Sequence, residues 1–175
     1  MDLVIRNGTV VTSGIEAVTD VGVRDGVIMQ IGGDMTGTTE IDATDRYVLP
    51  GGIDAHVHLT APGTGPDSWR WVDDFEVGTR AAAAGGVTTV GNMSFPQPGE
   101  QMKAGLLRDN ADAAANAIVD YFQHTVLLNP DDEGIAQIEE LAAAGNPSIK
   151  IFMSFRRFDR HLDGFLRAMQ AAADA

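Results

Sequence analysis

The feature that most constrains the fold of this chain is the alternation of apolar segments with alanine-rich stretches after residue 50. The apolar segments predict strands at residues 53–59, 87–93, 118–128 and 148–155, and the other stretches predict helices at 71–84, 101–117, 132–144 and 162–175. Strands and helices that alternate at this spacing are typical of a parallel sheet covered by helices. The sequence therefore predicts an α/β protein.

Four strand–helix units fit two architectures. A closed TIM (β/α)₈ barrel has eight strands in about 250 residues, so 175 residues would hold only the first half of such a barrel. An open doubly wound sheet could close its core with four or five strands and is the alternative. No glycine-rich phosphate-binding motif follows any of the predicted strands, which disfavours that alternative.

The first 50 residues follow a different pattern. Short runs of β-branched residues are separated by Asn7-Gly8 and Asp25-Gly26. Such pairs tolerate the positive φ angles of primed turns, so they predict hairpins in a small antiparallel sheet. Pro50-Gly51-Gly52 ends this region. We expect a small β domain at 1–50 and the strand–helix domain at 51–175.

Composition excludes several classes of partner and site. The formal net charge of −13, from 25 acidic and 12 basic residues, disfavours binding to nucleic acid or to an anionic membrane surface. The chain has no cysteine, so any metal ligands must be histidines, carboxylates or less usual groups. Neither a secretory leader nor a membrane span is expected, which predicts a cytoplasmic protein.

Two of the four histidines, His56 and His58, are separated by one residue in the segment 53–59. Side chains on a strand repeat every two residues, so both imidazoles should face the same way while Val57 and Leu59 face the other way. Paired imidazoles suit zinc and its first-row neighbours, and barrel enzymes build their sites where these strands end. The pair is a candidate for metal binding, and the alternative is two polar residues near a strand end.

Lys150 lies in the apolar segment 148–155. Burial disfavours its ammonium charge, so the side chain must be neutral, paired or modified, unless its flexible stem carries the amine to water. A neutral amine can react with carbon dioxide to give a carbamate, an anionic ligand with two oxygens that can bridge two metal ions. Lys150 is therefore a candidate carboxylated lysine.

The segments around these residues resemble a known enzyme family. Residues 48–58, VLPGGIDAHVH, resemble the first-strand motif of cyclic amidohydrolases, and residues 74–90 resemble the helix and second strand that follow it in hydantoinases, dihydropyrimidinases and allantoinases. Residues 148–153, SIKIFM, resemble the carboxylated-lysine strand of the hydantoinase and dihydropyrimidinase branch. The resemblance includes the N-terminal β region, which in that family belongs to a small β-sandwich beside the barrel.

This resemblance implies a binuclear site, usually zinc, in which a metal-bridging hydroxide attacks the carbonyl of a cyclic amide such as a hydantoin or dihydropyrimidine. His56 and His58 would bind the more buried metal ion, and the carbamate of Lys150 would bridge two divalent ions. Further ligands and a proton-handling aspartate would come from strands beyond residue 175, so the chain alone is expected to be inactive. The resemblance also implies a homo-oligomer, a tetramer in the family.

One position departs from the family pattern. Hydantoinases and dihydropyrimidinases have a tyrosine five residues after the lysine, where its hydroxyl helps to hold the developing oxyanion, and this chain has Phe155. The loss of one such donor can cost about 3 kcal/mol of transition-state stabilisation. His161 or Arg156 could replace it, and an exposed polar loop is the alternative interpretation of both.

Other residues near the ligands are candidates for the substrate pocket or for support of the site. The predicted pocket residues are Trp69, Trp71, Asn92 and Phe155. The two tryptophans could wall a ring-binding pocket or cover the core. Asp54 could orient a ligand imidazole or make a structural hydrogen bond, and His124 is expected to be a structural histidine.

Two kinds of function fit these residues. The first is a hydrolase of a hydantoin or dihydropyrimidine, or of allantoin or another cyclic ureide given Phe155. The second is a non-catalytic scaffold such as the collapsin response mediator proteins, which keep the barrel and have lost the metal site. The presence of His56, His58 and Lys150 favours the enzyme, and the ligands expected beyond residue 175 leave the scaffold open.

Overall fold

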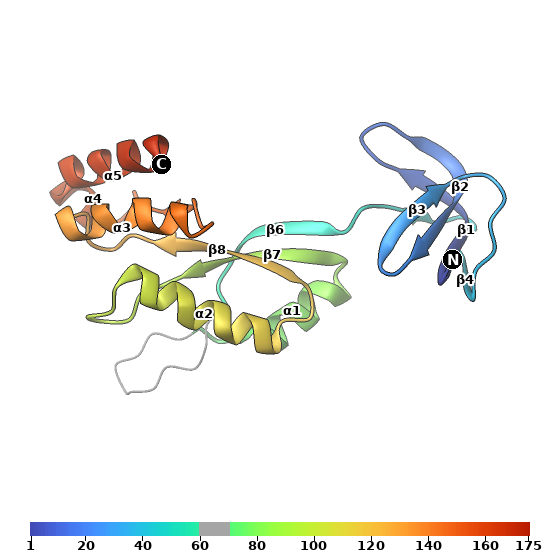
Figure 1. Cartoon of the computed structure of the whole chain (residues 1–175), viewed down its shortest axis with the longest axis horizontal. Helices are drawn as coiled ribbons and strands as arrows, with labels where there is room; N and C mark the ends of the chain where they lie inside the picture. Colours follow the sequence, from blue (N-terminus) through green and yellow to red (C-terminus); the bar gives the residue numbers. More distant parts are fainter. Residues whose placement is uncertain (60–70) are drawn as a thin grey trace. The chain divides into compact units, whose positions relative to one another are not determined.

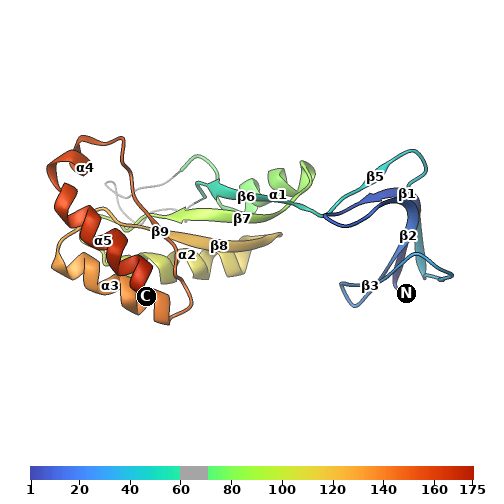
Figure 2. The same cartoon turned by 90° about the horizontal axis from the view of Figure 1, so that it is seen from above.

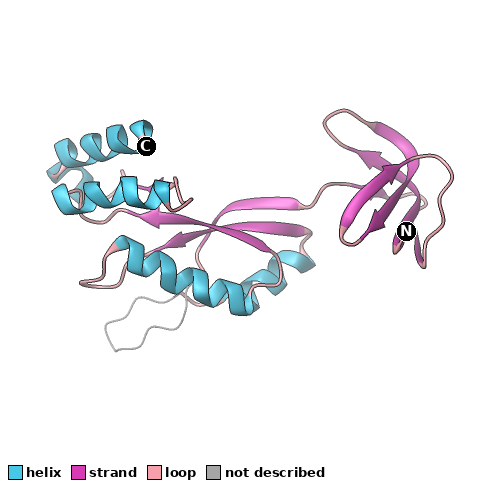
Figure 3. Ribbon diagram, viewed as in Figure 1, coloured by secondary structure: helices cyan, strands magenta, loops and turns pink. Residues whose placement is uncertain are grey.

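A computed structural model describes residues 1–59 and 71–175 of the chain. The chain divides into two compact units, Met1–Gly51 and Gly52–Ala175. The first unit is built from strands, and the second alternates strands with helices (Figure 3). No helix in the described ranges is long and apolar enough to cross a membrane.

The first unit is a single mixed sheet. Its strands are β1 (Leu3–Val11), β2 (Glu16–Arg24), β3 (Val27–Ile31), β4 (Thr39–Asp42) and β5 (Tyr47–Val48), in the order β3-β2-β1-β4 with β5 also paired to β1. β1–β2 and β2–β3 are antiparallel, whereas β4 and β5 run parallel to β1. The expectation of a purely antiparallel sheet was wrong, because the chain after β3 crosses back to the other side of β1 before it pairs again.

The two predicted turns of this sheet have different outcomes. Asp25 and Gly26, with φ angles of 51° and 74°, join β2 to β3, so this hairpin prediction is confirmed. The Asn7-Gly8 prediction was wrong, because both residues lie inside β1. The positive φ of Asn7, 63°, falls within an irregularity of the β1–β2 register instead of a turn. A glycine-containing pair can thus mark a bulge as well as a hairpin.

The second unit is a four-stranded parallel sheet with helices packed against it. Its elements are β6 (Gly52–Val57), α1 (Phe75–Ala84), β7 (Val87–Ser94), α2 (Met102–Asn116), β8 (Asp120–Val126), α3 (Asp132–Ala143), β9 (Ile149–Lys150), α4 (Arg156–Arg160) and α5 (Leu162–Asp174). The strands follow chain order, β6-β7-β8-β9. Helices α1 and α2 lie along one face of the sheet (Figure 1), and α5 lies beside α3 (Figure 2).

The described part of this unit has three core clusters, of which two lie beneath the helices and the third comprises Met93, Phe95 and Val126. One cluster lies under α1 and α2, and a larger one joins α2, α3 and α5; the largest fully buried apolar side chains of the two are Phe75, Val90, Leu127, Ile138 and Leu141. Each such side chain contributes about 1.5–3 kcal/mol when it is buried. This arrangement is the first half of a TIM (β/α)₈ barrel, and the predicted fold class is confirmed.

Capping residues explain where two helices begin. The carboxylate of Asp74 accepts a hydrogen bond from Val77 N (2.9 Å), and that of Asp131 accepts one from Gly134 N (2.8 Å). Such caps satisfy donors that a helix leaves open at its first turn. Helix α1 therefore begins at Phe75, four residues later than expected.

The last strand is much shorter than expected. Only Ile149 and Lys150 pair with β8, flanked by hydrogen bonds from Thr125 N to Ser148 O and from Leu127 N to Lys150 O, each 3.0 Å. Because β8 ends at Val126, no strand of the described residues lies beside the residues after Lys150. They turn into the short helix α4, which the sequence did not predict.

Candidate metal and substrate site

The two candidate histidines lie together at the C-terminal end of β6. Their ring centroids are 5.3 Å apart, with 48° between the ring planes. Val57 and Leu59 belong to the core cluster under α1 and α2. The alternation expected of a strand therefore brings both imidazoles to one side, although β6 already ends at Val57 and carries a bulge between Asp54 and Val57.

His58 is the more enclosed of the two. Its ring lies 4.3 Å from the Trp71 ring and 5.8 Å from the Phe95 ring. Partial burial lowers the pKa of His58 below its usual value, and the positive charges of His56 and Lys150 lower it further. Its Nδ1 atom is buried without a hydrogen-bond partner among the described residues. A neutral imidazole with an unpartnered nitrogen is a suitable metal ligand.

Lys150 ends β9, half-buried, with Nζ 4.9 Å from the centroid of the Phe152 ring. No carboxylate in residues 1–59 and 71–175 forms an ion pair with it. Within the same ranges no group of three histidines or carboxylates could hold a metal ion, so the local donors are two imidazoles and one amine. Carboxylation of Lys150 would add the anionic oxygens that this donor set lacks, and the residues present therefore fit a metal site.

The predicted pocket residues have different surroundings. Trp71 contacts His58, and Phe155 stacks on Phe152 at 4.9 Å with half of its surface exposed. Trp69 lies outside the described residues. Asn92 is fully buried: its Oδ1 accepts a hydrogen bond from Leu59 N (2.7 Å) and its Nδ2 donates to Gln123 Oε1 (2.9 Å). The structure gives Asn92 a structural role, and its contact with substrate stays a prediction.

The remaining candidate site residues either have hydrogen-bond partners within the protein or are exposed to solvent. Asp54 accepts a hydrogen bond from the backbone N of His56 (3.0 Å), which is the structural alternative rather than support of an imidazole. Arg156 and His161 are exposed at the two ends of α4. Both ring nitrogens of His124 have partners, Ala55 O at 3.1 Å and Ser148 Oγ, as expected of a structural histidine.

Phe95 is a site residue that the sequence did not single out. It directly follows β7, is 4% exposed, and its ring lies 5.5 Å from Trp71 and 5.7 Å from Phe152 as well as beside His58. It therefore packs between the histidines and the lysine segment. An apolar residue at a strand end carries no chemical signal, so only the neighbouring strands reveal this role.

A charged network from α2 holds the turn that carries Phe95. Arg108 donates to Phe95 O (2.9 Å) and to Asp109 Oδ1 (3.0 Å) and pairs with Glu100, which accepts from Gln97 N (2.7 Å). Burial raises the pKa of the Asp109 carboxyl, which Arg108 partly offsets. The network fixes the backbone on which Phe95 is presented.

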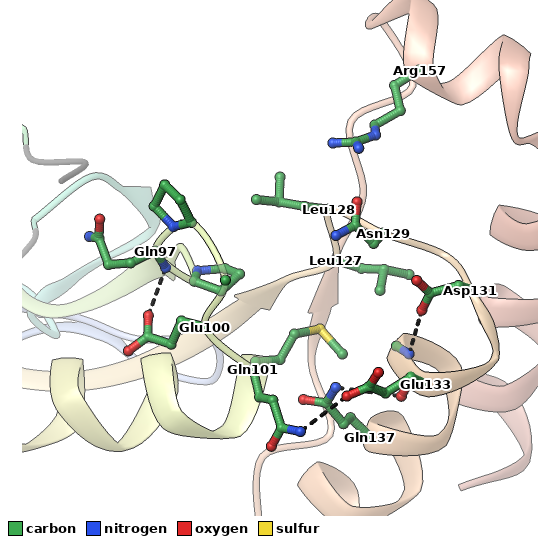
Figure 4. Close-up of a pocket in the computed structure, with 15 residues that line it drawn as sticks. Gln97, Glu100, Gln101, Leu127, Leu128, Asn129, Asp131, Glu133, Gln137 and Arg157 are labelled. Carbon is green, nitrogen blue, oxygen red and sulfur yellow. Dashed lines mark hydrogen bonds between the residues drawn. The ribbon is translucent and has the colours of Figure 1, made fainter. Parts of the chain in front are cut away.

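A pocket of about 410 Å³ lies between the first turns of α2 and α3 (Figure 4). Its polar lining is largely committed to bonds within the wall, as in the pairs Gln97–Glu100 and Gln101–Glu133. Neither His56 nor His58 nor Lys150 lines it. The candidate metal residues therefore lie at the C-terminal ends of β6 and β9, apart from this pocket.

Comparison with known proteins identifies the class to which this half-barrel belongs. The Amidohydrolase family model matches residues 47–163. The D-hydantoinase of Rhizobium radiobacter is 37% identical over 176 residues, covering 99% of this chain and 38% of that protein. An allantoinase of Rubrobacter xylanophilus is 42% identical over 160 residues, covering 87% of this chain and 32% of that protein. A solved D-hydantoinase structure superposes with a TM-score of 0.86 at 33% identity, over 99% of this chain and 38% of that chain.

The chain belongs to the amidohydrolase family. Within that family it is of the hydantoinase type, as the resemblance of its motifs implied. It spans about 38% of the length of the D-hydantoinase that it matches.

Proposed function

We propose that the protein carrying this chain hydrolyses a carbon–nitrogen bond of a cyclic amide such as a hydantoin or dihydropyrimidine. The observation that supports this most directly is the proximity of His56, His58 and Lys150, whose side chains form no ion pair with a carboxylate in residues 1–59 and 71–175. The sequence similarity to a D-hydantoinase, which extends over 99% of this chain, independently supports the same function.

In this proposal each residue has a separate task. The imidazoles of His56 and His58 would hold the more buried of two divalent metal ions, zinc by preference, and a carboxylated Lys150 would contribute its oxygens to both. When bound, such a pair supplies an activated water at neutral pH and polarises the amide carbonyl. Trp71 and Phe155 exclude water and flank the planar ring of the substrate. The acid or base that handles the proton is supplied by residues outside this chain.

Carboxylation of Lys150 also accounts for its electrostatic setting. The ammonium first loses one proton, and the neutral amine nitrogen then attacks the carbon of carbon dioxide and loses a second proton, so a cation becomes a carbamate anion. Since His56, His58 and Lys150 are all potential cations close together, this change replaces repulsion with attraction. The proposal extends to a cytoplasmic homo-oligomer, a tetramer as the resemblance implies.

A cyclic ureide such as allantoin is the second candidate substrate. Phe155 lacks the hydroxyl that the hydantoinase pattern has at this position, and an allantoinase is 42% identical to this chain. A non-catalytic scaffold is the third candidate function. The measured metal content distinguishes it from the two candidate enzymes, because the scaffold would bind no metal.

Metal analysis and a substrate panel test the proposal on the intact protein. We expect about two metal ions per chain and turnover of a hydantoin, dihydrouracil or allantoin. His56→Ala and His58→Ala should each lose the more buried ion, and Lys150→Arg should lose activity because a guanidinium cannot form the carbamate. His161→Ala, a matched exposed histidine, should retain full metal content.

Three results would contradict the proposal. Wild-type protein that binds no metal and opens none of the rings supports the scaffold. Equal metal loss in His161→Ala would show that β6 carries no specific site. Full activity of Lys150→Arg, or an unmodified lysine in the crystal structure of active protein, would contradict the proposed carboxylation of Lys150.

A further inference from the structure

We propose that His124 is a positioning residue that sets the distance between the His56–His58 pair and Lys150, and that Gly91 leaves the room it needs. This inference deepens the proposed function and rests on it. The bonds made by His124, however, are properties of the fold and can be tested separately.

His124 connects two segments that the sheet keeps apart. It lies on β8, in register with Met93 of β7, and β7 separates β8 from β6. Its Nε2 nevertheless lies 3.1 Å from the backbone O of Ala55, and its Nδ1 is hydrogen-bonded to the hydroxyl of Ser148. Ala55 directly precedes His56, and Ser148 lies two residues before Lys150. One imidazole therefore links both segments that carry the proposed ligands.

The bulge in β6 explains why Ala55 can serve as the acceptor. Asp54 pairs with Val90 and Val57 pairs with Asn92, so three steps along β6 face two steps along β7. A bulge leaves its extra residue outside the regular ladder of backbone hydrogen bonds. The carbonyl of Ala55 is thereby available to a side chain, and His124 satisfies it.

Gly91 on β7 explains how a side chain of β8 can reach that far. A Cβ at this position would stand 2.8 Å from Ala55 O and 2.7 Å from Cζ of Phe122. Both separations are shorter than any ordinary contact of a methyl group. Gly91 does not have a positive φ, so the strand backbone would accept other residues there. The glycine is required for space, because any side chain would displace the Ala55 carbonyl or the Phe122 ring that packs edge-on against His124.

The partners also define the tautomer of His124. A carbonyl oxygen only accepts, so Nε2 must carry a proton. In the neutral ring Nδ1 then accepts from the hydroxyl of Ser148. This arrangement orients the imidazole from both sides, as hydrogen-bonded neighbours of metal ligands do in other sites.

The test uses the intact protein and compares His124→Leu with His124→Gln. We expect His124→Leu to weaken metal binding by about 10–100-fold, while saturating metal still restores the full stoichiometry. This separates a positioning residue from a ligand, since His56→Ala should not regain its ion. His124→Gln keeps a donor and an acceptor and should recover part of the affinity. Turnover should fall mainly in kcat, with KM nearly unchanged.

Two further variants make the test specific. Gly91→Ala should weaken metal binding in the same direction, and its effect should not add to that of His124→Leu because both break one contact. Asn146→Leu is the matched control, since Asn146 also joins β8 to the segment before β9, through Thr125 Oγ1 (2.8 Å), without reaching β6. It should keep the wild-type metal affinity. Equal weakening in Asn146→Leu, or none in His124→Leu, would overturn the inference.

Readouts without metal or substrate keep the inference independent of the proposed function. Imidazole ¹⁵N shifts should show His124 protonated at Nε2 and not at Nδ1, and crystals of His124→Leu should show a changed separation between Ala55 and Ser148. If the wild type neither binds metal nor opens a ring, the proposed function fails while these two measurements still decide the role of His124. The opposite tautomer, or an unchanged separation, overturns it.

Discussion

At the scale of single residues, Phe155 is the side chain whose chemistry bears most directly on substrate choice. Its ring stacks on Phe152, which in turn lies 4.9 Å from Nζ of Lys150. A hydroxyl on this ring would therefore be added within the wall of the proposed site. Whether such a donor helps depends on where negative charge develops on the substrate.

Phe155→Tyr should raise turnover of a hydantoin or dihydropyrimidine by up to about two orders of magnitude, because one well-placed oxyanion donor contributes about 3 kcal/mol. The gain should appear mainly in kcat, since the charge develops only on the way to the tetrahedral intermediate. Steady-state kinetics on a panel of cyclic ureides measures it. Phe158→Tyr, whose ring packs on Phe165 away from the site, should change neither constant, and no effect of Phe155→Tyr on any substrate would remove residue 155 from the chemistry.

Gly78 is a second residue whose identity affects the site, through close packing. It lies in α1, and a Cβ there would stand 2.2 Å from Cδ2 of Leu59, the buried residue that follows His58. Gly78→Ala should lower the free energy of unfolding by about 1–3 kcal/mol through overpacking, and should weaken metal binding by displacing the backbone next to His58.

Denaturant unfolding and metal titration measure both effects of Gly78→Ala. Gly85→Ala is the matched control at the end of the same helix, because its Cβ would make only ordinary contacts at 3.4 and 3.6 Å. That control should be nearly neutral. Equal stability of the two variants would show that Leu59 can move aside.

At the scale of secondary-structure elements, β1 carries a charged cluster that joins its neighbours. Arg6 donates to Asp20 of β2 (2.8 Å) and to Glu40 of β4 (3.1 Å), and Asn7 N donates to Asp20 Oδ1 (2.9 Å). The backbone bond from Asn7 and the guanidinium lower the pKa of Asp20, and the guanidinium lowers that of Glu40.

This cluster predicts an acid-sensitive N-terminal sheet. Because both carboxylates have a lower pKa in the folded state, their stabilisation is fully present above their unfolded pKa of about 4 and is lost as pH falls through the folded values. Arg6→Gln should flatten the dependence of unfolding on pH below about 4, without removing it, since Asn7 N still binds Asp20. Circular dichroism of acid unfolding measures this. Arg80→Gln, which breaks an exposed pair with Glu76 in α1, should leave the slope unchanged, and an equal change in both variants would contradict the prediction.

The elements that could be predicted from the sequence are those with a long apolar pattern. Strands β6 to β8 and helices α1 to α3 and α5 lie within a few residues of their expected ranges, because strand periodicity and capping act locally. The two-residue strands β5 and β9 and the five-residue helix α4 depend on tertiary neighbours. Asn7-Gly8 was misassigned because a bulge and a hairpin favour the same residues.

The residues of the candidate site also differ in whether they could be predicted from the sequence. His56, His58 and Lys150 could be selected from the sequence because imidazoles two residues apart and an amine in an apolar segment are chemically conspicuous. Phe95, Gly91 and the bonds of His124 could not be selected, because their roles depend on which strands lie side by side. Spatial neighbours of this kind carry no local pattern.

At the scale of the whole molecule, the parallel sheet of the second unit has two edge strands, β6 and β9. In the described residues no strand pairs with the outer side of β6 or of β9, and Ile53 on β6 is 69% exposed. Unpaired edges and exposed apolar side chains favour association with other chains.

A polypeptide of these 175 residues alone should therefore be inactive and should self-associate at micromolar concentration. Light scattering after size-exclusion chromatography measures this. Ile53→Lys places a charge on the edge strand and should reduce association, whereas Leu107→Lys, at an exposed position of α2, should reduce it less. A monodisperse monomer with a cooperative thermal transition would contradict the prediction.

The bulge in β6 has a consequence for sequence divergence among relatives. Ala55 offers His124 only its backbone oxygen, so many side chains could stand at this position without loss of that bond. Removing the residue is different, because it would remove the bulge and with it the carbonyl that His124 binds. Between Asp54 and His58 the chain should therefore tolerate substitutions at position 55 more readily than a change of length, even one that keeps all three proposed ligands.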